Sequence, residues 1–308
     1  MADDAISSHP VAHHPLPGVV VANYGGCLDV ETDDGTIRRC TARRRIGALV
    51  CGDRVIWQEG PCCSGVVEQL LPRHTLLART DSQGRPKPLA ANVDNIVVVA
   101  SPSPGIDEDL IDHYLVAAEH TGITPILLIN KRDLLTDQAL LRQRRRLSVY
   151  TDIGYRLIFA STKQQCGLDE LIRAIRGRNT VFCGESGVGK SSLINALLPG
   201  IDARVAELSA ASGKGVHTTT TARLYRLPQG GAVIDSPGVR EFGLGKMAVA
   251  EISDAFVEFR KYAEKCRFRD CTHRAEPGCA VVAACEQGRI SARRLESYRH
   301  MVVSFADC

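Results

Sequence analysis

The sequence lacks long hydrophobic runs, an apolar leader and a strong charge imbalance, and each absence excludes a class of protein. No stretch reaches the ~18 consecutive apolar residues of a transmembrane helix, and no charged-then-apolar signal segment opens the chain. We therefore expect no membrane partner. The formal net charge is only +3, so any surface that binds nucleic acid must be local.

The apolar content, 44% of 308 residues, is sufficient for two or three domains with separate cores. Short Val/Ile-rich runs separated by turns, such as GVVVANYGG at 18–26 and GDRVIW at 52–57, predict a small closed barrel. An OB-fold is the simplest interpretation of these short strands, with an SH3-like barrel as the alternative. Later apolar runs, beginning with DNIVVVA at 94–100, alternate with helical stretches and predict a parallel sheet covered on both faces.

Twelve cysteines are present, but the absent leader and a phosphate-binding motif favour a reducing cytosol over a disulfide scaffold. Cys266, Cys271 and Cys279 lie near His273 within fourteen residues. Three thiolates and one imidazole suit tetrahedral Zn²⁺, and four protein ligands leave no open position, so we expect a structural site. Free thiols within helices are the alternative. Glu276 is expected to be a solvated neighbour.

The segment GESGVGKS at 184–191 matches G-x-x-x-x-G-K-[ST] and lies between a strand-like run and an apolar-periodic helix. Its glycines allow backbone N–H groups to surround phosphates at a helix N-terminus. Lys190 is expected to reach the β- and γ-phosphate oxygens, as a catalytic and a binding group, and Ser191 to hold Mg²⁺. The expected nucleotide contacts in this segment are Gly184, Glu185, Ser186, Gly187, Val188, Gly189, Lys190, Ser191 and Ser192.

Two further segments suit phosphate and magnesium sensing. Asp235-Ser-Pro-Gly238 ends an apolar run in the pattern D-x-x-G, which places Asp235 near Mg²⁺ and the Gly238 amide toward the γ-phosphate. GKGVHTTTT at 213–221 offers a threonine that would close on Mg²⁺. Thr219 is favoured and Thr218 is the alternative. An ordinary polar loop would have the same composition.

A guanine-reading motif is predicted where ILLINKRDLL at 126–135 ends an apolar run in Asn-Lys-x-Asp. The Asp133 carboxylate can accept both N1–H and N2–H of guanine, a donor pair that adenine lacks. Asn130 and Lys131 complete the motif. Ser161, at the end of the next strand-like run, is expected to present its backbone N–H to guanine O6. The sequence therefore favours GTP over ATP.

The order of these motifs is unusual, because the guanine motif at 130–133 precedes the phosphate loop at 184–191. When the motifs are followed cyclically from the phosphate loop, they have the usual order of a GTPase, so we predict a circularly permuted GTPase domain. Its second switch leads directly into the C-terminal domain, on which a nucleotide-driven movement could pull. The predicted parts are a disordered tail (1–17), an OB-fold RNA-binding domain (18–75), a linker (76–91), the α/β GTPase domain (92–245) and a mainly helical zinc-binding domain (246–308).

Arginine-rich stretches are candidates for contacts with RNA phosphates. RRCTARRR at 38–45 is expected on a barrel loop, a recurrent binding surface of OB-folds, although neighbouring acidic residues could neutralise it. RQRRR at 142–146 is expected to be a solvated helix face. A third possible phosphate-contacting group is Arg289, Arg293, Arg294 and Arg299. The expected RNA-binding residues are Arg38, Arg39, Arg43, Arg44 and Arg45.

A small β-barrel, a permuted GTPase and a Cys/Cys/His/Cys module, in this order, resemble the ribosome small-subunit-dependent GTPases of bacteria, the RsgA/YjeQ family. The resemblance extends from about residue 18 to at least residue 298. It includes CGDRV at 51–55, KPLAANVDNIVVV at 87–99 and CRFRDCTHRAEPGCAV at 266–281. The last stretch matches the zinc motif of the family at every ligand.

The resemblance implies a cytoplasmic, monomeric late assembly factor of the small (30S) ribosomal subunit. Such a factor binds rRNA through its barrel and zinc domains and hydrolyses GTP faster on the particle, with one structural Zn²⁺ and with Mg²⁺ bound to GTP. Val239 stands where Ras-like enzymes carry a water-orienting Gln after D-x-x-G. The family's candidate for that role is His217, and an inert loop histidine is the alternative.

Three other functions would use the same motifs. The main alternative is a GTP-dependent regulatory switch that binds RNA or protein partners other than the ribosome. A nucleic-acid-binding module with a vestigial nucleotide site is disfavoured by the intact Lys190, Ser191 and Asp235. An ATPase is disfavoured by Asp133 and Asn130, which select guanine.

Overall fold

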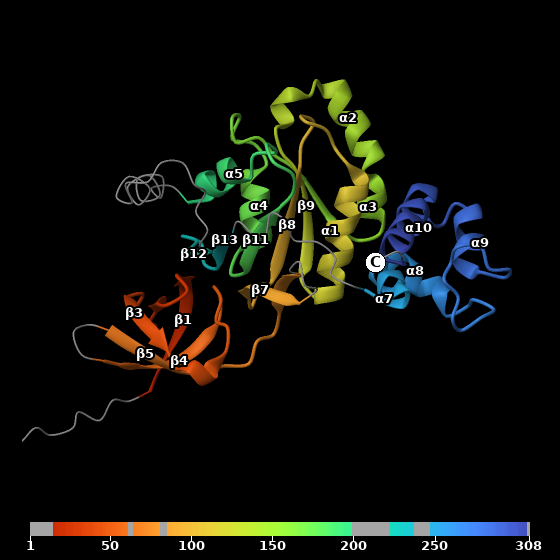
Figure 1. Cartoon of the computed structure of the whole chain (residues 1–308). Coiled ribbons are helices and arrows are strands. Elements are labelled where there is room, and N and C mark those ends of the chain that lie inside the picture. Colours follow the sequence, from red (N-terminus) through yellow and green to blue (C-terminus); the bar gives the residue numbers. More distant parts are fainter. Residues whose placement is uncertain (1–14, 61–63, 81–84, 199–221, 237–246, 307–308) are drawn as a thin grey trace, which may run out of the picture.

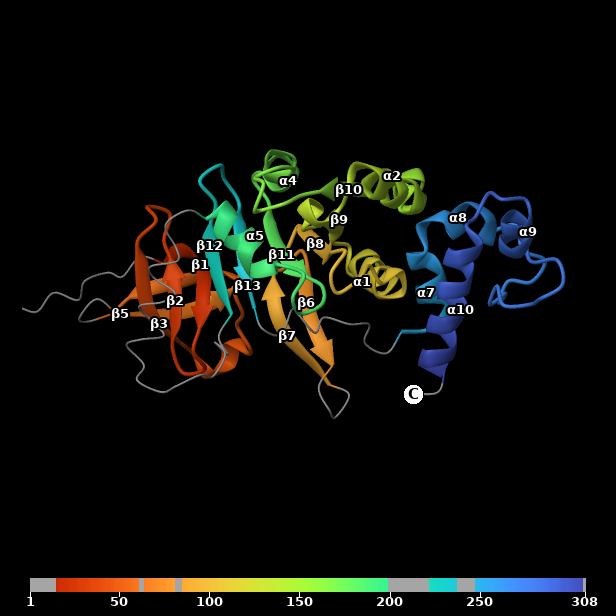
Figure 2. The same cartoon turned by 90° about the horizontal axis from the view of Figure 1, so that it is seen from above.

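The computed structural model describes residues 15–60, 64–80, 85–198, 222–236 and 247–306 (Figure 1). The described parts form an N-terminal barrel, a central sheet flanked by helices and a C-terminal helical module, which follow one another along the molecule (Figure 2). None of the described helices is long and apolar enough to cross a bilayer.

Five strands form the barrel: β1 (Leu16–Asn23), β2 (Leu28–Glu31), β3 (Ile37–Ala42), β4 (Arg54–Glu59) and β5 (Ser64–Leu70). They pair in the order β1–β2–β3–β5–β4, and β4 pairs again with β1, so the sheet closes. Alternation along β4 buries Val55 and Trp57. Gly65 is needed opposite Trp57, because a Cβ there would lie 2.7 Å from the indole ring. The predicted small closed barrel is confirmed.

The segment that was expected to be a linker contains a β-hairpin. Strands β6 (Leu76–Thr80) and β7 (Pro86–Ala91) pair antiparallel. Leu77 and Ala90 are fully buried in the same core as Ile96 of the central sheet. The polar, proline-bearing sequence around 80–92 predicts a linker, but burial of these few apolar side chains against the central domain stabilises strands instead.

Six strands form the central sheet: β8 (Asn95–Ala100), β9 (Thr124–Ile129), β10 (Arg156–Phe159), β11 (Asn179–Cys183), β12 (Arg223–Arg226) and β13 (Ala232–Asp235). The order is β10–β9–β8–β11–β13–β12, with β12 antiparallel and the others parallel. Every position of β8 is buried, as in a strand covered on both faces. A pairing of Ala22 with Arg223 joins β1 of the barrel to β12.

Helices cover both faces of this sheet: α1 (Glu108–Thr121), α2 (Asp137–Arg146), α3 (Ser148–Asp152), α4 (Leu168–Ile175) and α5 (Lys190–Leu197). Leu115 of α1 and Tyr150 of α3 belong to one core, and Leu171 of α4 and Leu193 of α5 to the other. The helix α1 begins where the Asp107 carboxylate accepts hydrogen bonds from two backbone amides of its first turn.

The C-terminal module contains α7 (Val249–Ala255), α8 (Val257–Ala263), α9 (Ala280–Glu286) and α10 (Ala292–Ala306). Its core is built around the stacked and edge-to-face rings of Phe256, Phe259 and Tyr298. Val116 of α1 belongs to the same core, so the module is packed on the central domain. The predicted mainly helical C-terminal part is confirmed.

Candidate functional site

The phosphate loop connects β11 to α5 at the carboxyl edge of the sheet, and two of its glycines are sterically required. Gly184 has φ +128°, and a Cβ there would lie 2.1 Å from the Val99 carbonyl oxygen. Gly189 has φ +96°, and a Cβ there would lie 2.4 Å from the Asn130 side-chain nitrogen. The loop is therefore held against the neighbouring strand ends without room for side chains at these positions.

Lys190 opens α5 and is 8% exposed. Its ammonium donates to the backbone carbonyls of Gly184 at 2.7 Å and Glu185 at 2.5 Å, across the loop. Ser191 and Ser192 follow in the exposed first turn of α5. An ammonium, two exposed hydroxyls and the amides of a helix start therefore occur together at this edge of the sheet, a combination that suits phosphate groups.

The guanine motif lies beside the phosphate loop, at the ends of neighbouring parallel strands. Asn130 is 2% exposed and donates from Nδ2 to the Val188 carbonyl of the loop at 2.9 Å. Its Oδ1 atom is buried and has no hydrogen-bond partner among the described residues. Lys131 adopts a left-handed backbone conformation with φ +55°. Asp133 lies in the short 3₁₀ turn that follows, half-buried.

Ser161 lies beside Asp133, but its backbone differs from the expectation. The Ser161 amide, expected to face guanine O6, donates to the Cys166 carbonyl at 3.0 Å. Its side-chain hydroxyl donates to Asp133 Oδ1 at 2.5 Å and accepts from the Gln164 amide at 3.1 Å. The visible contribution of Ser161 is therefore to orient the Asp133 carboxylate. A turn closed by a residue five positions later is not evident in the local sequence.

Asp235 ends β13, which runs parallel to β11 through pairs such as Val181 and Ile234. It therefore reaches the same edge of the sheet as the phosphate loop, where ligands bind in open α/β sheets. The other predicted switch residues lie outside the described residues: His217, Thr218, Thr219 and Gly238.

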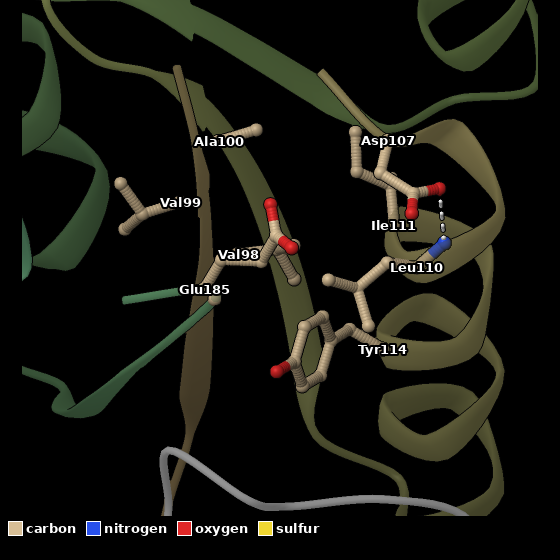
Figure 3. A pocket seen from close by; sticks show the side chains of 9 residues that line it. Val98, Val99, Ala100, Asp107, Leu110, Ile111, Tyr114 and Glu185 are labelled. Carbon is tan, nitrogen blue, oxygen red and sulfur yellow. Dashed lines mark hydrogen bonds between the residues drawn. The ribbon is translucent and has the colours of Figure 1, made fainter. Parts of the chain in front are cut away.

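A small, partly open pocket lies on the α1 side of the phosphate loop (Figure 3). Gly184 and Glu185 line it from the loop, and Asp107 and Tyr114 line it from α1. The Glu185 carboxylate points into the space between β8 and α1. Lys190 does not line this pocket, although its ammonium contacts the carbonyls of the two loop residues that do.

The four predicted metal ligands are brought together. The donor atoms of Cys266, Cys271, His273 and Cys279 all lie within 4.8 Å of one another. The Cys266 and Cys279 sulfurs are 3.9 Å apart, and His273 Nδ1 lies 3.6 Å and 3.4 Å from them. Tetrahedral Zn²⁺ requires edges of about 3.8 Å between sulfurs and about 3.6 Å between sulfur and nitrogen. The donor set and its spacing therefore fit zinc.

The protein around this cluster fixes the imidazole and keeps it neutral. His273 is 3% exposed, and its ring packs edge-on against Phe259 with centroids 6.0 Å apart. Burial lowers the pKa of His273, which favours the neutral ligand form. Burial also raises the pKa values of the Cys271 and Cys279 thiols, so their thiolates need a cation nearby.

Glu276, expected to be a solvated neighbour, organises the ligand loop. Its carboxylate accepts hydrogen bonds from the Thr272 amide at 2.7 Å, the Thr272 hydroxyl at 2.5 Å and the Arg274 amide at 3.0 Å. Burial acts to raise the pKa of Glu276, but these hydrogen bonds outweigh it and lower the pKa to about 2. The sequence gives only a weak indication of this role, namely that an acidic residue lies between the ligands His273 and Cys279.

The arginines predicted to bind RNA divide into two groups. Arg39 pairs with Asp29 at 2.7 Å and Arg43 pairs with Glu68 at 2.5 Å. Arg44 and Arg45 are exposed, and in the described part of the chain no carboxylate lies within 4.0 Å of them. Arg38 is half-buried on β3. Neutralisation by neighbouring acids therefore applies to only part of the stretch.

The third arginine group is corrected by the structure. Arg294 is fully buried and pairs with Asp112 at 2.7 Å, and Arg293 pairs with the same carboxylate at 2.8 Å. Arg299 donates to the Arg274 carbonyl at 2.7 Å, and Arg289 alone of the four is exposed. The expectation of a phosphate-contacting group is wrong for Arg293 and Arg294, because Asp112 on α1 pairs with both guanidinium groups and Arg294 is buried.

Comparison with solved structures gives the same architecture. YjeQ from Thermotoga maritima matches with a TM-score of 0.80 and 31% identity, covering 95% of this chain and 99% of that one. YloQ, described as a circularly permuted GTPase, matches with a TM-score of 0.78 and 28% identity, covering 97% and 98%.

Sequence relatives agree with these structural matches. Proteins named "Small ribosomal subunit biogenesis GTPase RsgA" from Azotobacter vinelandii and Pseudomonas aeruginosa are 49% and 50% identical over 294 and 290 residues. Each comparison covers 94% of this chain and 86% of the relative. The family model for the RsgA GTPase matches residues 70–245. The chain belongs to the RsgA GTPase family.

Proposed function

We propose that this protein hydrolyses GTP as a late maturation factor of the small (30S) ribosomal subunit, which it binds through rRNA and which stimulates hydrolysis. The observation that carries the proposal is the convergence of the phosphate loop, Asn130 and Asp133 at one sheet edge in a member of this family. The names of the relatives at about half identity supply the biological process.

In this proposal the phosphate loop binds the triphosphate with its amides, and the Lys190 ammonium exchanges its two carbonyl partners for phosphate oxygens. Ser191, Thr219 and Asp235 hold or orient Mg²⁺, which would neutralise charge that develops on the phosphates. Lys190 supports catalysis because its fixed positive charge lies where negative charge grows in the transition state.

Guanine selection is assigned to Asp133, whose carboxylate would accept N1–H and N2–H of the base. The Ser161 hydroxyl fixes one carboxylate oxygen at 2.5 Å, which keeps the acceptor oriented. The buried Oδ1 of Asn130 has no partner among the described residues, which is the state expected of a group awaiting a ligand donor.

The zinc centre is proposed to be structural, with four protein ligands and no open position. The barrel loop carrying Arg44 and Arg45 is proposed to contact rRNA phosphates. We further propose that the protein acts as a cytoplasmic monomer. The domain limits proposed are 18–75 for the barrel, 92–245 for the GTPase domain and 246–308 for the zinc domain.

His217 is proposed to orient the attacking water, because Val239 follows the D-x-x-G segment and its side chain has no hydrogen-bonding group. His217→Ala is then expected to remove the stimulated turnover and to keep GTP affinity. Unchanged stimulation by small subunits in this variant would exclude His217 from that role.

The proposal is tested by sedimentation of the protein with purified small or large subunits, with GTP analogue or GDP present. Co-sedimentation with small subunits alone, stronger with the analogue, is expected. The alternative is a GTP-dependent regulatory switch that acts away from the ribosome, and the intact nucleotide motifs would serve it equally. Tight GTP binding without co-sedimentation would favour that alternative.

A further inference from the structure

An aromatic ring is exposed on the loop that carries the metal ligands. Phe268 is 42% exposed, and arginines flank it on both sides. The guanidinium of Arg267 lies 5.6 Å from the centroid of the Phe268 ring. In the described part of the C-terminal module, Val303 on α10 is the other large apolar side chain with comparable exposure, at 43%. The ring is thus an isolated apolar surface bordered by cations.

The backbone below this ring is fixed from both sides. Phe268 lies between the ligands Cys266 and Cys271, and the Cys271 amide donates to the Phe268 carbonyl at 3.4 Å. The Arg267 amide donates to the Gly278 carbonyl at 3.2 Å, across the ligand loop. The zinc cluster would therefore fix the backbone that carries the ring, so that less ordering is needed when a ligand binds.

The charges around the ring are not neutralised within the described protein. In residues 265–271 three cations, Lys265, Arg267 and Arg269, face one acid, Asp270. All four are exposed, and no carboxylate in the described residues lies within 4.0 Å of the three cations. Other arginines of the same module, by contrast, are engaged in ion pairs. These exposed cations are therefore free to contact an anionic partner outside the chain.

We propose that Phe268 stacks on an unpaired base of single-stranded RNA while Arg267 and Arg269 contact the adjacent phosphates. Aromatic rings bordered by cations are the common means of binding unpaired bases, since every base has a π-face and every nucleotide a phosphate. A protein partner would need a wider contiguous apolar area than one ring supplies. The inference rests on the proposed function and adds to it that the zinc module reads an unpaired base.

The first test uses fluorescence of a Phe268→Trp variant, loaded with zinc and otherwise full-length. Trp57 is the one tryptophan of the chain and is 1% exposed in the barrel core, so the parent protein supplies the background. Titration with a uridine hexaribonucleotide is expected to quench the new indole but not the parent. An abasic oligonucleotide of equal length should not quench it. Quenching equal to the parent, or equal with the abasic oligonucleotide, would overturn the proposal.

The second test compares affinities of Phe268→Ala and Val303→Ala for small subunits and for the hexaribonucleotide. Loss of one stacked base is expected to weaken binding of both by about 5- to 100-fold in the first variant. Val303→Ala serves as the control in the same module and should be unchanged. Arg269→Ala should reduce the salt slope of RNA binding by about one phosphate contact.

The outcomes separate this inference from the proposed function. Binding of the oligonucleotide is measured without ribosomal subunits. Stacking on Phe268 can therefore be established even if subunits do not accelerate GTP hydrolysis. Weakened binding of Phe268→Ala to subunits, with oligonucleotide binding unchanged, would replace RNA by a ribosomal protein as the partner and overturn the proposal. Zinc content, measured in each variant, shows that the loop is intact.

Discussion

Asp112 of α1 and Arg294 of α10 form a fully buried ion pair between the central domain and the C-terminal module, with 2.7 Å between Oδ1 and Nη1. Arg293 donates to the second carboxylate oxygen at 2.8 Å, and the Tyr150 hydroxyl donates to Oδ1 at 2.9 Å. Arg294 also makes two hydrogen bonds to Glu258 of α8, at 2.7 Å and 3.0 Å. Buried charges persist only when they are paired, so this network fixes the module on α1.

Replacement of Asp112 by Asn should release the C-terminal module. The change leaves two arginines short of negative charge inside the protein, and breaking a buried pair in this way costs about 3–5 kcal/mol. Hydrogen exchange of the α10 amides measures this as a loss of protection. Arg260→Ala is the control, because the Arg260–Glu119 pair is partly exposed and about 0–1 kcal/mol is expected. Equal protection of α10 in both variants would contradict the role given to the network.

Loss of one zinc ligand should unfold the ligand loop. Cys271→Ser removes a thiolate from a site whose binding free energy is coupled to folding, so the purified variant is expected to contain little zinc. Cys285→Ser is the matched control, since Cys285 is half-buried in α9 but outside the cluster. Native mass spectrometry measures the zinc content of both variants. Full zinc content in Cys271→Ser would remove Cys271 from the ligand set.

A methyl group at Gly189 should weaken GTP binding. It would meet the Asn130 side-chain nitrogen at 2.4 Å, in addition to the strain of an alanine at φ +96°. We expect about 10- to 100-fold lower GTP affinity, from strain of about 1–3 kcal/mol at the loop. Gly187→Ala separates the two causes, because Gly187 lies in the same loop at φ +81° with no neighbouring atom within 4 Å of its added Cβ. Similar GTP affinity in both variants, by titration calorimetry, would show that the contact with Asn130 is unimportant.

Asp133→Asn should change the base that the site prefers. Asparagine offers one acceptor and one donor in place of two acceptors, so it matches the N1–H and C2 carbonyl of xanthine. Loss of charge-assisted hydrogen bonds to guanine is expected to weaken GTP by about 100-fold, while xanthosine triphosphate gains. Competition binding measures the ratio of the two affinities. A ratio equal to that of the parent would mean that Asp133 does not read the base.

The nucleotide and metal residues could be predicted from the sequence because each set depends on a short local pattern. GESGVGKS needs only a strand before it and a helix after it, and β11 and α5 provide them. The ligands from Cys266 to Cys279 lie on one loop, so close spacing in the chain becomes close spacing in space. The alternating apolar residues of β4 likewise predict a strand with one buried face.

Contacts between residues distant in the sequence could not be predicted in this way. The Arg293–Arg294 pair resembles any exposed basic stretch until Asp112, which lies on α1, is placed beside it. Leu77 lies in a short apolar run just before the polar segment around 80–92, and packing on the core of the central domain makes that run a strand. The Ser161 amide donates a hydrogen bond to the Cys166 carbonyl. No residue pattern in this segment predicts the turn that this bond closes.

The measurement that tests the central claim most directly is phosphate release from GTP with small subunits, large subunits or neither added. Lys190→Ala, assayed in parallel, corrects for contaminating hydrolases. Acceleration by small subunits alone is predicted, roughly tenfold or more, because positioning one catalytic group contributes about 10²–10⁴-fold. Equal rates in all three mixtures, with GTP still bound tightly, would contradict a GTPase that acts on the small subunit.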